Sequence, residues 1–162
     1  MDDVTKARIL ADAQSKADLG KYRQALKVMR PLLDIGAPEA LFLYSTFSLA
    51  GTESDVEFER RSLDLLTRAA DSGYAPALYA LGVCYEVGDL VAPDPDFAAA
   101  LLRAAAERGY PKAKFRHGLN LFYGSNKMPR DEEYGLALIR NAAKLGVHDA
   151  VDFLKDEGLP ID

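Results

Sequence analysis

A nine-residue segment occurs twice in the chain with little change, as AADSGYAPA at 69–77 and AAERGYPKA at 105–113. A third copy, AAKLGVHDA, occupies 142–150, and a more divergent copy, LLDIGAPEA, occupies 32–40. Each copy has a central glycine, and these are spaced 37, 36 and 37 residues apart: Gly36, Gly73, Gly109 and Gly146. A fixed period of this length is typical of a protein built from stacked structural repeats.

Each repeat predicts two helices. A first segment begins four residues after a repeat glycine, at Ala40, Ala77 or Ala113, carries apolar residues four apart and ends in a further glycine. This spacing indicates an α-helix, and a glycine just past its end is a common helix stop. A second apolar segment precedes each Ala-Ala pair. We therefore expect helix pairs at 7–18/21–34, 37–50/57–72, 75–87/95–108 and 111–123/131–145, followed by a short helix near 148–157.

Small residues recur at one position of each predicted helix, and their spacing is partly constant. The distance from the second helix of one pair to the first helix of the next is always 20 residues: Ala25 to Ser45, Ser62 to Gly82, and Ala98 to Gly118. Only the loop within a pair varies. Because a small residue lets two helix backbones approach closely, Gly82 and Gly118 are predicted to lie where the helices of a pair nearly touch.

The repeat at 75–110 combines these features as Leu81-Gly82, Tyr85, Gly88, Asp94, Ala98 and Ala105-Ala106. This pattern resembles the Sel1-like repeat family, which is related to tetratricopeptide repeats. The resemblance implies a right-handed α–α solenoid that forms a single repeat domain over 1–162. Its parts would be a tetratricopeptide-like hairpin (1–36), three Sel1-like repeats (37–74, 75–110 and 111–147) and a capping helix with a tail (148–162). The match is weaker at Ser45, Ser48, Ser62, His117 and Gly135.

Composition limits the classes of partner. Hydrophobic residues make up 49% of the 162 residues and the formal net charge is −5, so general attraction to nucleic acid is not expected. We find no apolar run of membrane-spanning length and no signal peptide in MDDVTKARIL. A single cysteine, Cys84, cannot form an internal disulfide. These features predict a cytoplasmic protein that is a monomer or weak dimer and binds neither membrane nor nucleic acid.

Catalytic chemistry is not expected. No HExxH, CxxC, GxSxG or phosphate-loop motif occurs. One of the two histidines, His117, falls on the packed side of a helix, and Cys84 is interpreted as an inert buried thiol. Asp94 and Asp96 flank a proline, which indicates a helix start rather than a metal site. The resemblance likewise implies an adaptor or regulator, so we predict no catalytic residue, cofactor or metal.

The resemblance places the first helix of each pair on the concave face of the solenoid. The candidate partner-binding residues on this face are Phe42, Thr46, Tyr79, Val83, Glu86, Lys112, Phe115, Arg116, Leu119 and Phe122. Phe42, Tyr79 and Phe115 share one repeat position and would form an aromatic ladder. Exposed aromatic residues in a groove often anchor a protein partner. The alternative is that neighbouring helices cover the ladder, including the last helix through Val151, Phe153 and Leu154.

Charge is segregated along the chain. Residues 69–102 contain five acids and no Lys or Arg, whereas residues 108–130 contain six bases and no acid. Such a pattern is usually a solvated surface, but opposite patches could also orient one partner. Three hypotheses follow: a module that binds a protein or peptide on its concave face, an immunity or antitoxin-like inhibitor of a toxin, and an RNA binder or enzyme.

Overall fold

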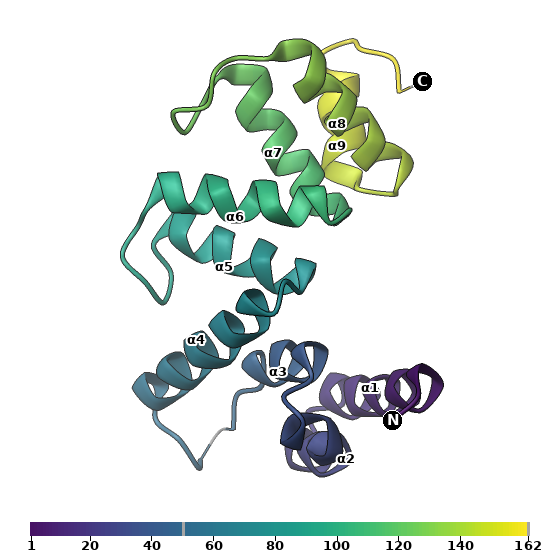
Figure 1. The fold of residues 1–162 in the computed structure, drawn as a ribbon, viewed down its shortest axis with the longest axis vertical. Coiled ribbons are helices and arrows are strands. Elements are labelled where there is room, and N and C mark those ends of the chain that lie inside the picture. The colour runs from purple at the N-terminus through teal and green to yellow at the C-terminus, as the bar shows by residue number, and fades with distance from the viewer. Residues whose placement is uncertain (50, 162) are drawn as a thin grey trace. The chain divides into compact units, whose positions relative to one another are not determined.

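The computed structural model describes residues 1–49 and 51–161. Within these ranges the chain forms nine α-helices and no strand, which confirms the all-α prediction. The helices are α1 (Asp3–Asp18), α2 (Tyr22–Asp34), α3 (Pro38–Ser45), α4 (Asp55–Asp71), α5 (Ala75–Val87), α6 (Pro95–Glu107), α7 (Pro111–Tyr123), α8 (Glu132–Lys144) and α9 (His148–Asp156) (Figure 1). Contacts divide them into two compact units, Met1–Ala77 and Leu78–Asp162.

Helix starts follow from local hydrogen bonding. Ser54 accepts a hydrogen bond from the Glu57 N–H, and the Glu57 carboxylate accepts one from the Ser54 N–H, which completes a capping box at α4. Asp94 caps α6 and Asp131 caps α8 in the same way, through the N–H three residues later. These caps satisfy backbone donors that have no partner inside a helix, and they fix where α4, α6 and α8 begin.

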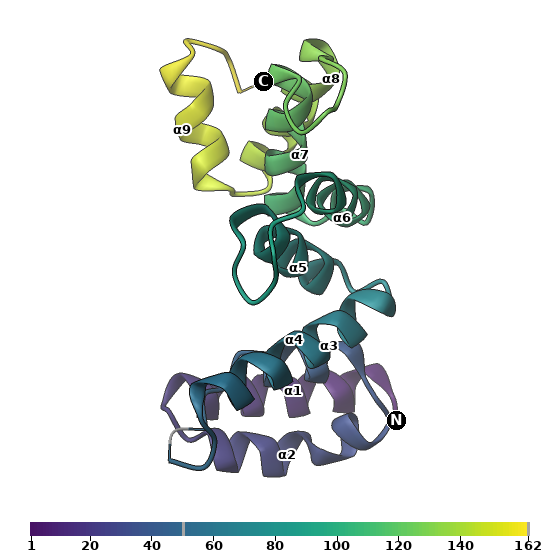
Figure 2. The same cartoon turned by 90° about the vertical axis from the view of Figure 1, so that its left-hand side faces the viewer.

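The N-terminal unit contains α1 to α4 and the start of α5. Helices α1 and α2 pack side by side, and α3 packs on α4 (Figure 2). Fully buried residues of α1 and α2 pack together in its core, among them Ala13, Ala25, Met29 and Leu32. Ala13 and Ala25 are the small residues at which the sequence predicted the first pair of helices to pack.

Helix α3 is shorter than predicted. The sequence pattern predicted helix over 37–50, but α3 ends at Ser45, and Ala50 lies outside the described residues. The Ser45 hydroxyl donates to the Phe42 carbonyl (2.6 Å), and the Thr46 hydroxyl donates to the Leu43 carbonyl (2.8 Å). Hydroxyls that bond their own backbone compete with the helix, so Ser45 and Thr46 favour an early end.

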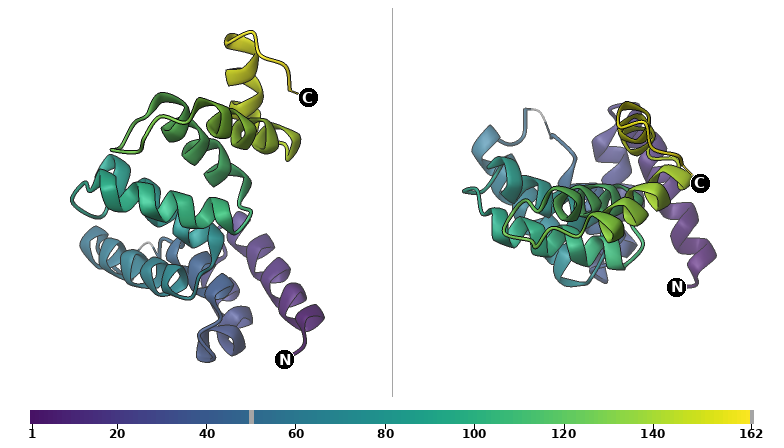
Figure 3. Two further views of the ribbon diagram at one scale, coloured as in Figure 1. Left: turned by 45° about the horizontal axis from the view of Figure 1, so that its top comes forward. Right: turned by 90° about the horizontal axis from the view of Figure 1, so that it is seen from above.

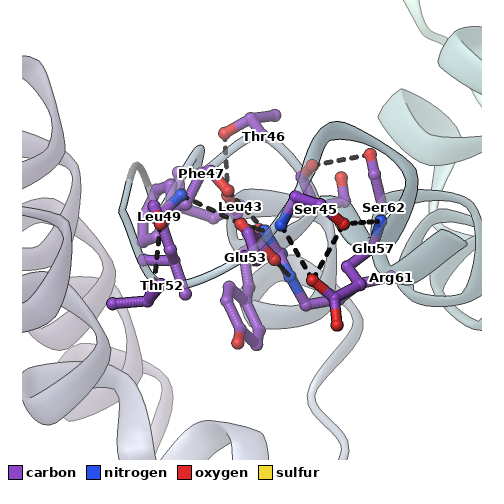
Figure 4. A network of polar contacts seen from close by, with 12 residues as sticks. Leu43, Ser45, Thr46, Phe47, Leu49, Thr52, Glu53, Glu57, Arg61 and Ser62 are labelled. Atoms are coloured by element: carbon purple, nitrogen blue, oxygen red, sulfur yellow. Dashed lines mark hydrogen bonds and ion pairs between the residues drawn. The ribbon is translucent and has the colours of Figure 1, made fainter. Parts of the chain in front are cut away.

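Arg61 of α4 stabilises that early end from the other side. Its guanidinium donates to the Tyr44 carbonyl (3.1 Å), the Phe47 carbonyl (2.6 Å) and the carboxylate of Glu53 (2.7 and 2.9 Å) (Figure 4). The chain then turns, and the Phe47 side chain enters the core with 1% of its surface exposed. Because Arg61 satisfies the Tyr44 and Phe47 carbonyls, these groups need no helical partner, and the chain can leave the helix one turn before the predicted end.

The C-terminal unit contains the rest of α5 and helices α6 to α9. Helices α7 and α8 cross closely, and α9 packs on α8 (Figure 3). The core of this end is formed by Ile139, Ala142, Ala150 and Leu154, all fully buried. Gly109 precedes α7 with a φ of 85°, a left-handed conformation that side chains other than glycine rarely adopt. The other three repeat glycines also have positive φ, which explains why the residue type recurs.

The two predicted glycine contacts are confirmed. A Cβ atom built on Gly82 of α5 would lie 3.1 Å from Leu102 Cγ of α6. A Cβ atom on Gly118 of α7 would lie 2.8 Å from the Gly135 carbonyl oxygen of α8. In the first repeat Ser45 and Ser62 take these places, and the Ser62 hydroxyl donates to the Ser45 carbonyl (2.7 Å).

Candidate partner-binding face

The three ladder aromatics are each half-buried and each contact another ring. The ring of Phe42 meets Tyr74 edge-on with centroids 5.6 Å apart. In the C-terminal unit Tyr79 packs against Tyr110 at 5.2 Å, and Phe115 packs against Phe153 of α9 at 6.4 Å. The ladder position is therefore partly covered by other aromatic side chains.

Two of those covering residues share a repeat position that is not among the predicted site positions. Tyr74 and Tyr110 directly follow the repeat glycines Gly73 and Gly109, so the GY dipeptide was a visible signal. The equivalent residue in the last repeat is Val147, and Phe153 of α9 supplies the ring there instead. The predicted contact of Phe153 with this face is present.

The remaining predicted apolar site residues have different environments. Val83 and Leu119 are half-buried, whereas Thr46 is exposed at the C-terminal cap of α3. Phe122 has 9% of its surface exposed and belongs to the core, where its ring packs edge-on against Phe153. A partner could not reach Phe122 in this arrangement, so we leave it out of the proposed binding face.

The segregated charges pair with one another. Arg116 of α7 forms an ion pair with Glu86 of α5, and Lys127 pairs with Asp96 of α6. Both contacts join a base of residues 108–130 to an acid of residues 69–102. These pairs neutralise part of each patch, while Lys112 remains exposed at the start of α7.

An apolar groove lies beside Phe42 in the N-terminal unit. Its volume is about 320 Å³, and it is lined by Leu10, Ala11 and Gln14 of α1, Glu39, Phe42 and Leu43 of α3, and Tyr74. Leu10 lies three residues before the small residue of α1, which makes it the counterpart of Phe42 in the ladder. The N-terminal hairpin therefore extends the ladder position to α1.

A second depression lies in the C-terminal unit between the starts of α7 and α9. It measures about 430 Å³ and includes Tyr110, Lys112, Val147 and His148 in its lining. Lys112 is the one predicted site residue there, and Tyr110 is the residue that packs on Tyr79.

His117, Cys84 and Asp94 each lie in surroundings that explain them without catalysis. Burial lowers the pKa of His117, which is 4% exposed, and burial raises the pKa of the Cys84 thiol. The Asp94 carboxylate caps α6 by accepting from the Phe97 N–H (3.0 Å). Within residues 1–49 and 51–161, no three His, Cys, Asp or Glu side chains gather closely enough to hold a metal ion. In the same residues no helix is long and apolar enough to cross a membrane.

The chain is an α-helical repeat protein, because each helix pair is followed by a glycine at a fixed spacing and has small residues where its two helices cross. The Sel1 repeat matches residues 38–74, 75–110 and 111–147, close to the three repeats predicted. The chain belongs to the Sel1 repeat family.

Relatives agree with this assignment. Chitin synthase regulatory factor 3 of Schizosaccharomyces pombe is 30% identical over 107 residues, which are 66% of this chain and 12% of that protein. Chitin synthase regulator SKT5 of Saccharomyces cerevisiae is 27% identical over 119 residues, or 74% of this chain and 17% of that protein. The matched segments are therefore less than a fifth of these relatives.

A solved structure agrees with the fold. The Sel1 repeat protein of Oxalobacter formigenes superposes with a TM-score of 0.71 at 25% identity, and the match covers 81% of this chain and 97% of that one. The predicted class of Sel1-like helical solenoid is thereby confirmed.

Proposed function

We propose that the protein is a non-enzymatic interaction module that binds a partner protein or peptide through the first helices of its repeats. The observation that supports this most directly is the apolar groove beside Phe42, because grooves with aromatic walls commonly receive side chains of a partner. The two fungal relatives are named as regulators of chitin synthase, and the shared repeats are consistent with a binding role.

The C-terminal unit would contribute to the same activity. We propose Tyr79, Val83, Phe115 and Leu119 as its apolar contacts, and Glu86, Lys112 and Arg116 as charged contacts at their edge. In the N-terminal unit the corresponding proposed residues are Phe42 and Thr46. The protein would act in the cytoplasm, without a cofactor and without binding nucleic acid.

Affinity capture from the native host, followed by mass spectrometry, tests this function. Wild-type protein should retain a specific partner, and Tyr79→Ala should lose it, because a half-buried aromatic loses most of its contact area on truncation. Tyr134→Ala is the matched control, since this tyrosine lies exposed on the second helix of its pair. Equal capture by all three proteins would contradict the proposed face.

A second control separates binding from stability. Leu101→Ala removes a buried side chain of α6 and should lower the unfolding temperature first, with capture lost only as a consequence. The alternative function, an immunity or antitoxin-like inhibitor, rests on the acidic charge of the chain. Recovery of a toxin-like enzyme as the captured partner would favour that alternative.

A further inference from the structure

The groove in the N-terminal unit combines three kinds of wall. Leu10 and Ala11 of α1 with Leu43 of α3 supply aliphatic surface. The rings of Phe42 and Tyr74 supply an aromatic wall, with their planes at 65° to each other. Glu39 of α3 supplies the only charged side chain in the lining that the structure describes.

The carboxylate of Glu39 is only half satisfied. Its Oε1 atom lies 2.7 Å from Lys6 Nζ of α1, and this ion pair joins α1 to α3. Its Oε2 atom is buried and has no hydrogen-bond donor in the described chain. A buried carboxylate oxygen without a donor is costly, and a donor from a partner would remove that cost.

We propose that this groove receives an arginine side chain from a partner protein, with Glu39 as its counter-ion; the proposal rests on the interaction function above and names the partner's chemistry. The aliphatic stem of the arginine would lie against Leu10 and Leu43. Its guanidinium would stack against the aromatic wall and donate to Glu39, whose terminal torsion is soft enough to turn an oxygen toward it.

Arginine fits these walls better than lysine. A guanidinium is planar, weakly hydrated and able to stack on a ring while it donates in its own plane. An ammonium is a compact, strongly hydrated charge that would have to shed more water in an apolar groove. The contact with Lys6 uses one carboxylate oxygen of Glu39 and leaves the other without a donor. In Glu53, by contrast, both oxygens already accept hydrogen bonds from the protein.

A peptide titration followed by NMR tests the proposal on the full chain. The probe is acetyl-Ala-Leu-Arg-Leu-Ala-amide, and its matched control carries citrulline, a neutral isostere, in place of arginine. The arginine peptide should give saturable shifts at Leu10, Glu39 and Phe42 at millimolar concentration, and the citrulline peptide should bind about tenfold more weakly. Equal binding of the two peptides, or shifts confined to the C-terminal unit, would overturn the proposal.

Variants assign the effect to the groove. Glu39→Gln should reduce binding of the arginine peptide to that of the citrulline peptide, whereas Asp64→Asn, which removes an exposed acid of α4, should leave it unchanged. Because Glu39→Gln also breaks the Lys6 contact, Ala11→Tyr provides a second test. The new tyrosine side chain would fill the groove from an exposed position on α1 and leave the Lys6–Glu39 ion pair in place. It should therefore abolish the shifts caused by the arginine peptide.

Failure of the arginine site can be told apart from failure of the interaction function. If the captured partner of the wild-type protein is lost in Tyr79→Ala but the arginine peptide does not bind, the interaction function stands and the arginine site is wrong. If Ala11→Tyr leaves peptide shifts intact, the groove is not where the arginine binds.

Discussion

Gly118 of α7 and Gly135 of α8 meet backbone to backbone. A Cβ atom on either glycine would lie within 2.8 Å of the other's carbonyl oxygen. Helix backbones come this close only where neither residue has a side chain. The pair therefore fixes the crossing of α7 and α8, and neither glycine can be exchanged without moving a helix.

The first prediction tests this crossing. Gly118→Ala and Gly135→Ala should each lower the free energy of unfolding by about 1–3 kcal/mol, since the added methyl group meets backbone atoms that cannot move aside. Urea unfolding followed by circular dichroism measures the change.

Gly82→Ala is the matched control. Its new Cβ would meet side-chain atoms of Leu102 at 3.1 and 3.2 Å, and alanine favours helix by about 1 kcal/mol over glycine, so the net change should be small. Equal losses in all three variants would show that backbone contact is not the cause.

The helix pairs were predictable because local signals agree with the packing. The repeat glycines, the small crossing residues and the acids at helix starts all mark the same boundaries, and most predicted ends fall within a few residues of those observed. The early end of α3 was not predictable. It depends on Arg61, which lies 14 residues after Phe47 in sequence and does not belong to the repeat pattern.

The candidate face was predictable only in part. The shared position of Phe42, Tyr79 and Phe115 is visible in the sequence, but the ring that covers each one comes from another segment of the chain. Likewise, sequence shows an acidic and a basic stretch, whereas the pairing of Glu86 with Arg116 depends on how α5 and α7 stack. Repeat spacing gives the position of a side chain and not its neighbours.

The second prediction concerns Arg61. Arg61→Ala should lower the free energy of unfolding by about 1.5–3 kcal/mol, because the carbonyls of Tyr44 and Phe47 lose a charged donor. Arg61→Lys should restore little, since an ammonium cannot match the planar fork of a guanidinium. Hydrogen exchange should also accelerate at residues just after α3.

Arg68→Ala serves as the control for this position. Arg68 is an exposed residue of the same helix and lies 3.5 Å from Asp64, so its loss should cost less than about 0.5 kcal/mol. A comparable loss in both variants would mean that the network around Arg61 adds nothing specific.

The third prediction concerns acid stability. Burial, with a smaller effect from Arg103, lowers the pKa of His117 below 6.5, so the unfolded chain binds a proton more readily than the folded one. Stability from this group is complete above pH 6.5 and is lost as the pH falls toward the folded pKa. The slope should approach about 1.4 kcal/mol per pH unit at most.

Denaturation midpoints between pH 5 and 7 measure that slope, a window above the usual titration of exposed carboxylates. His117→Gln should remove most of it. His148→Gln, a substitution at an exposed position, is the matched control. A slope that persists unchanged in His117→Gln would assign it to other groups.

The fourth prediction concerns the ion pair of Glu86 and Arg116. About a quarter of the Glu86 side chain and a third of the Arg116 side chain are exposed, so solvent screens the attraction only in part. A double-mutant cycle with Glu86→Gln and Arg116→Gln should give a coupling of about 0.5–1 kcal/mol that shrinks in 1 M salt. The charge swap Glu86→Arg with Arg116→Glu should recover part of the stability that either reversal alone removes. If the coupling is zero while Lys112→Glu slows association with a captured partner, the bases of α7 act on the partner rather than on α5, as the charge pattern of the sequence first suggested.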